Sequence, residues 1–115
     1  MPIPDTIQTL IARLSQKLDE IESEVAQGLE LLGTLMSGFS DNVILVQYFA
    51  YLNAILFFIA TAKKQIQTAI EVISPDDVPP EIVQEAGEDL GNLFGRVIEE
   101  EMRVRQIVDF LEELP

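Results

Sequence analysis

The chain has 115 residues, with 20 Asp or Glu against 7 Lys or Arg and a formal net charge of -13. This length predicts one domain, residues 1–115, and the apolar content of 48% is too high for a disordered chain. The absence of Cys and His excludes disulfides, Cys-ligated zinc and the commonest general base, and the acidity disfavours nucleic-acid phosphates.

The first predicted helix spans residues 5–36. Its apolar residues recur at alternating spacings of four and three from Ile7 to Leu35, which forms a continuous row, or seam, over four heptads. Ser37 and Gly38 then supply stop signals. A helix of this length would be about 48 Å long and needs a packing partner in water.

The second predicted helix spans residues 42–73, and no charge interrupts it from Asn42 to Ala62. A run of 21 uncharged residues reaches the length of a membrane span. Its seam, however, continues from Leu45 past Lys63 and Lys64 to Ile73. A helix surrounded by lipid would not be expected to extend one apolar seam into its charged half. We therefore interpret this segment as a soluble helix buried by protein.

Several apolar residues of this second helix lie off the seam. A three-helix bundle would leave some of them as an apolar patch larger than a soluble monomer usually shows. We therefore expect self-association as a two-fold dimer. The off-seam residues are Val43, Ile44, Val46, Phe49, Tyr51, Leu56, Phe57 and Phe58, and the candidate interaction residues among them are Phe49, Tyr51, Phe57 and Phe58.

The third predicted helix spans residues 80–113. A proline pair precedes and begins it, where a missing amide costs nothing, and acidic residues occupy its first turns. Its seam is interrupted only at Glu100. We expect Glu100 to lie near a bundle end or to pair with an arginine, Arg13 or Arg103.

Gly87, Gly91 and Gly95 follow one stripe of the third helix. Glycine costs about 1 kcal/mol relative to alanine inside a helix, so the stripe needs a reason. A phosphate-binding loop would require a preceding strand and a Lys or Ser/Thr partner, which are absent here. We interpret the three glycines as interaction residues that allow close backbone approach or receive a bulky neighbour such as Phe49, Phe57 or Phe58.

The acidic run Glu99 to Glu101 does not predict a metal site. Three consecutive helical positions point in different directions, and a di-iron bundle would need Glu-x-x-His motifs. Without His or Cys, nucleophile–base pairs are also lacking. We expect no metal, no cofactor and no catalytic residue, and therefore no enzyme.

Two segments carry a resemblance to known proteins. DNVILVQYFAYLNAILFFI and EAGEDLGNLFGRVIEEE resemble small uncharacterised all-helical proteins of cyanobacterial genomes, some of which are labelled as restriction-enzyme specificity subunits. The resemblance implies a fold of long helices. It carries over no site residue and no DNA-reading activity, because the chain is neither large nor basic enough for a target-recognition domain.

Together these patterns predict an all-α fold of three long antiparallel helices, an up-down-up coiled-coil-like bundle that dimerises. The N-terminal MPIPDTIQTLIARLSQ lacks the features of a secretory signal, so we expect a cytoplasmic location. The expected function is an interaction or scaffold module that binds itself or another helical protein, with no nucleic acid and no membrane. The alternatives are a small membrane protein anchored by residues 43–62 and an acidic mimic that binds a basic protein, since residues 75–115 hold twelve acids and three bases.

Overall fold

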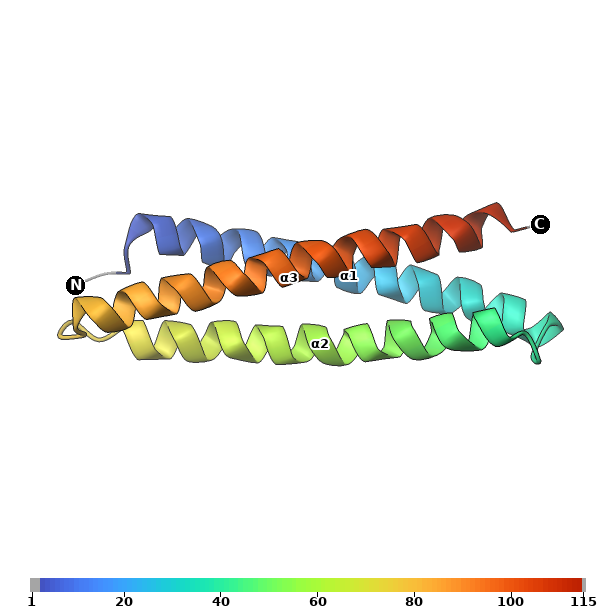
Figure 1. Cartoon of the computed structure of the whole chain (residues 1–115), viewed down its shortest axis with the longest axis horizontal. Coiled ribbons are helices and arrows are strands. Elements are labelled where there is room, and N and C mark those ends of the chain that lie inside the picture. The colour runs from blue at the N-terminus through green and yellow to red at the C-terminus, as the bar shows by residue number, and fades with distance from the viewer. Residues whose placement is uncertain (1–2, 115) are drawn as a thin grey trace.

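The computed structural model describes residues 3–114 and contains three helices joined by two short loops (Figure 1). Helix α1 spans Asp5–Gly38, α2 spans Val43–Ile73 and α3 spans Pro80–Glu113. They run up, down and up, and each packs against the other two. The structure thus confirms the predicted all-α fold, and each helix end lies within two residues of its predicted position.

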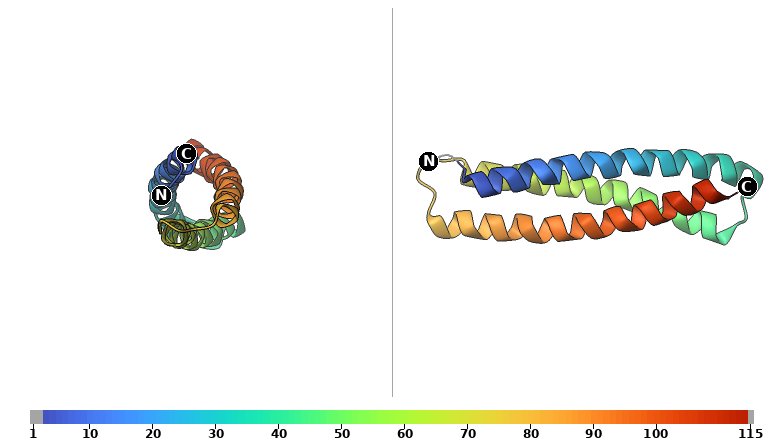
Figure 2. Two further views of the ribbon diagram at one scale, coloured as in Figure 1. Left: turned by 90° about the vertical axis from the view of Figure 1, so that its left-hand side faces the viewer. Right: turned by 90° about the horizontal axis from the view of Figure 1, so that it is seen from above.

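The molecule is a thin rod of 59 × 18 × 16 Å. Viewed along the rod, the three helices surround one common axis (Figure 2). A rod of this width has room for one layer of side chains from each helix. Every helix therefore buries one face and leaves the opposite face in water.

The core runs the whole length of the rod along the predicted seams. Leu14, Leu18 and Ile21 of α1 have no exposed surface, and Leu52 and Ile59 of α2 are buried in the same core. Burying an aliphatic side chain of this size contributes about 1.5–3 kcal/mol before entropic costs. The row of such residues is what holds three otherwise solvent-exposed helices together.

The helix starts satisfy their backbone amides in two ways. The Asn42 side chain accepts a hydrogen bond from the Leu45 amide at 3.2 Å and so caps α2. Helices α1 and α3 have proline at the cap position, and the Pro4 carbonyl accepts from the Ile7 and Gln8 amides at 3.0 Å. The proline that suits a helix start by its helical φ angle is Pro80, at the first position of α3, where its missing amide costs no hydrogen bond.

The seam of α3 differs from the prediction at one point. The sequence pattern placed Glu100 on the seam, whereas the structure buries Glu101, which is only 5% exposed. Val108 is buried as well. Glu101 and Val108 lie on the same flank of α3, and α1 packs against that flank. Lys17 of α1 reaches Glu101, and Gly28 of α1 lies against Val108. The seam prediction was therefore wrong by one position here.

Candidate interaction surface

The side of α2 that faces away from α1 and α3 is uncharged over residues 43–61. Helical periodicity places its exposed residues on one side of the helix. Phe57 is the most prominent of them, with 78% of its surface exposed. We call this surface the outer α2 face, and its members are Val43, Val46, Gln47, Ala50, Asn53, Ala54, Phe57, Ala60 and Thr61.

Large apolar side chains also border the outer α2 face near the start of α2. Ile44 is 51% exposed and Phe49 is 44% exposed. Phe39, in the turn just before α2, is 62% exposed. Most of the large exposed apolar residues thus lie on α2 or just before it, and the others, Ile82, Met102 and Phe110, lie on α3.

The most apolar part of the chain is therefore poorly covered. Among residues 3–114, α2 is the one helix long and apolar enough to cross a membrane, and only 22% of its most apolar 18-residue window is buried. A core helix of a soluble monomer would be mostly buried. An exposed apolar surface of this extent is typical of a site that contacts protein or lipid.

Tyr51, a predicted interaction residue, instead connects α2 to α3. Its hydroxyl donates a hydrogen bond to Glu100, whose carboxylate also pairs with Arg103 at 3.3 Å. Burial, followed by the hydrogen bond to Glu100, raises the pKa of Tyr51 to about 12. The pairing of Glu100 with Arg103 confirms one of the two partners that the sequence suggested.

Phe58 is likewise directed toward α3. The Arg96 guanidinium lies over its ring, with the guanidinium carbon 5.2 Å from the ring centroid. Of the four predicted aromatic residues, Tyr51 and Phe58 thus contact α3, whereas Phe49 and Phe57 remain exposed. The four do not form one site.

A network of charges lies between α1 and α3 near the middle of the rod. Lys17 Nζ is 3.2 Å from Glu101 Oε1, and Arg105 is 3.7 Å from the other oxygen of the same carboxylate. Arg105 also pairs with Glu24 at 3.0 Å. The second carboxylate oxygen of Glu24 is buried without a hydrogen-bond partner among the described residues. Arg105 follows Glu101 by one helical turn, but no sequence pattern indicated the contacts of these two residues with α1.

The three glycines of α3 lie in different surroundings. A Cβ at Gly87 would lie 3.3 Å from Ile7 Cδ1, so this glycine packs closely against α1. A Cβ at Gly91 or Gly95 would meet no atom within 4 Å. Within the chain, therefore, neither of these two receives a bulky neighbour, and both leave an exposed stripe on α3.

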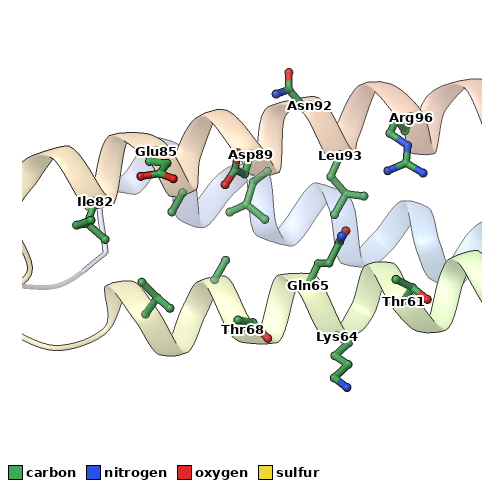
Figure 3. A pocket seen from close by; sticks show the side chains of 14 residues that line it. Thr61, Lys64, Gln65, Thr68, Ile82, Glu85, Asp89, Asn92, Leu93 and Arg96 are labelled. Carbon is green, nitrogen blue, oxygen red and sulfur yellow. The ribbon is translucent and has the colours of Figure 1, made fainter.

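A groove of about 700 Å³ separates the second half of α2 from the first half of α3 (Figure 3). Leu93 points into it, while Glu85 and Asp89 lie on its α3 side. Lys64 also borders the groove, but its side chain is directed away from it, toward the outside of α2. The groove is a shallow feature between two surface helices, unlike the enclosed pockets that bind small molecules.

Within residues 3–114, no three or more Asp or Glu side chains are grouped so that they could hold a metal ion. No protein-family model, curated protein or solved structure matches the chain. The resemblance to cyanobacterial helical proteins therefore stays a prediction. Among the surfaces of the described residues, the outer α2 face is the most distinctive.

Proposed function

We propose that the protein is a non-enzymatic helical interaction module that self-associates through the outer α2 face. The observation that supports this most strongly is the contrast between this face and the rest of the molecule. Residues 43–61 contribute no charge to it, although the chain as a whole carries -13. Elsewhere acidic side chains occupy outward positions of α1 and α3.

Apolar burial would supply the affinity. Phe57 exposes 78% of its surface, and covering such a side chain is worth about 2 kcal/mol. Val43 and Val46 are 66% and 45% exposed and would add smaller contributions. In a two-fold dimer every contact occurs twice, so these terms double before the entropic cost of association is subtracted.

Charge repulsion would restrict the geometry of association. Two copies that each carry -13 repel one another at most approaches. An approach through the outer α2 face brings uncharged surfaces together and leaves the acidic surfaces in water. The acidity thus favours this face over the rest of the surface.

Replacing Phe57 with glutamate tests the proposal. We expect sedimentation equilibrium at micromolar concentrations to give the wild-type chain twice its own mass. Phe57→Glu should weaken the dimer at least tenfold, because each copy loses apolar burial and adds a carboxylate to the contact. Met102→Glu is the matched control, since Met102 is 58% exposed but lies on α3. That control should leave the dimer intact, and circular dichroism should show unchanged helicity in both variants.

The membrane alternative has one observation in its favour, the low burial of the most apolar part of α2. The membrane alternative predicts that the chain binds lipid and does not dimerise in buffer. Flotation of the chain with phosphatidylcholine vesicles, together with a monomeric mass in buffer, would overturn the self-association proposal. Under our proposal the chain stays with the soluble fraction, because the outer α2 face is already covered by a second copy.

A further inference from the structure

The outer α2 face contains large and small residues on one line along the helix. Ala50 and Phe57 are seven residues apart, which is nearly two full turns, and Ala54 lies beside them. In a parallel pair of α2 helices, Phe57 would meet Phe57 and Ala50 would meet Ala50, which crowds one layer and leaves the other empty. In an antiparallel pair, each Phe57 can fit against the small Ala50 and Ala54 of the second copy, which favours close packing.

The charges just beyond the two ends of this face favour the same orientation. Lys64 follows Phe57 on the same line, and its side chain points outward (Figure 3). Asp41 lies in the exposed turn just before α2. Within residues 3–114, neither side chain forms an ion pair. An antiparallel pair brings Lys64 of each copy toward Asp41 of the other, whereas a parallel pair brings like charges together.

The pairing by side-chain size and the pairing by charge place the two-fold axis at nearly the same residues. The midpoint between Ala50 and Phe57 falls at residues 53–54, and the midpoint between Asp41 and Lys64 falls at residues 52–53. Asn53 is therefore the residue nearest the axis. Its amide nitrogen donates to the Phe49 carbonyl at 2.9 Å, which leaves its side-chain oxygen available to a second copy. A polar residue at such a position is known to fix register between helices.

We infer that two copies pack α2 against α2 in antiparallel orientation, about a two-fold axis near Asn53. Phe57 of each copy then lies on Ala50 and Ala54 of the other, and Lys64 of each pairs with Asp41 of the other. This inference rests on the proposed self-association and specifies its partner, orientation and register.

Single cysteine variants test the orientation, because the chain has no cysteine of its own. Asn53→Cys should form a disulfide-linked dimer under mild oxidation. Val46 and Ala60 lie seven residues on either side of Asn53, so Val46→Cys mixed with Ala60→Cys should also cross-link. Neither should cross-link alone, because equivalent positions would be about 21 Å apart, far beyond the reach of a disulfide.

Val43→Cys is the matched reporter for the other orientation. In the antiparallel dimer its two copies lie at opposite ends of the contact, so we expect no cross-link. A parallel dimer would cross-link Val43→Cys alone and would not join Val46→Cys to Ala60→Cys. That result, or a dimeric mass without any cross-link, would overturn the inferred orientation while leaving self-association in place. A monomeric wild-type mass would overturn both.

Charge exchange provides a second test that needs no oxidation. Lys64→Glu and Asp41→Lys should each weaken the dimer by a few-fold, as expected for exposed ion pairs. The double variant should recover most of that loss in sedimentation equilibrium, because the pair is restored with opposite polarity. Additive losses in the double variant would count against contact between these two residues.

Discussion

At the scale of single residues, Gly28 shows why one seam position of α1 must be glycine. A Cβ there would lie 2.8 Å from Leu52 Cδ1 and 3.3 Å from Val108 Cγ2. Leu52 has no exposed surface and Val108 is only 6% exposed, so neither can move without disturbing the core. Glycine lets α1 approach α2 and α3 at once, although it is a poor helix former.

We therefore expect Gly28→Ala to lower the free energy of unfolding by about 1–2 kcal/mol, because overpacking outweighs the gain in helix propensity. Gly91→Ala is the matched control, since nothing lies within 4 Å of its added Cβ, and should raise stability by about 0.5–1 kcal/mol. Urea denaturation at one fixed protein concentration measures both. Equal stability of the two variants would contradict close packing at Gly28.

At the scale of helices, two adjacent carboxylates connect α3 to both of its neighbours. Glu100 binds Tyr51 of α2, and Glu101 binds Lys17 of α1. Consecutive helical positions point about 100° apart, so two adjacent residues of α3 can lie on flanks that face different neighbouring helices. The acidic run that suggested no function from the sequence thus has a structural role in holding the bundle together.

The two carboxylates differ in burial, which makes the Lys17–Glu101 pair the more important for stability. Lys17→Met should lower the free energy of unfolding by about 2–3 kcal/mol, because it leaves a buried carboxylate with only the more distant Arg105. Adding Glu101→Leu should restore most of that loss. Lys63→Met is the control, since its partners Asp19 and Glu22 are exposed, and should cost less than about 1 kcal/mol. A similar cost for both lysines in urea denaturation would contradict this assignment.

The helices and most of the core followed from the sequence, and the reasons are visible in individual residues. Leu14 and Ile59 lie on uninterrupted seams, and period alone places them inside. Burial of Glu101 could not be read in this way, because a charged residue does not belong to a hydrophobic pattern and period does not tell which flank a neighbour will cover. For the same reason the sequence pattern predicted both Tyr51 and Phe57 as interaction residues, although α3 covers Tyr51 and leaves Phe57 exposed.

At the scale of the whole molecule, shape and charge act together. A rod 18 Å wide cannot enclose a helix as apolar as α2, so part of that helix must remain outside. The net charge of -13 keeps other surfaces of two copies apart. In the proposed dimer, the two elongated acidic rods therefore meet along their uncharged sides.

Salt dependence distinguishes this assembly from the acidic-mimic alternative. Raising NaCl from about 20 mM to about 500 mM shortens the Debye length several-fold and screens the repulsion between two copies. We expect the dimer dissociation constant to fall at least several-fold over that range. The Lys64–Asp41 contacts are also screened, but two exposed pairs contribute less than the repulsion between two chains of -13.

The Lys64→Glu variant should make this salt effect larger, since it takes the net charge of each copy from -13 to -15. Binding to a basic partner would show the reverse sign, because salt weakens attraction between opposite charges. Sedimentation equilibrium across the salt series measures both the sign and the slope. A dissociation constant that rises with salt would mean that attraction between opposite charges, and not contact between uncharged faces, holds the assembly together.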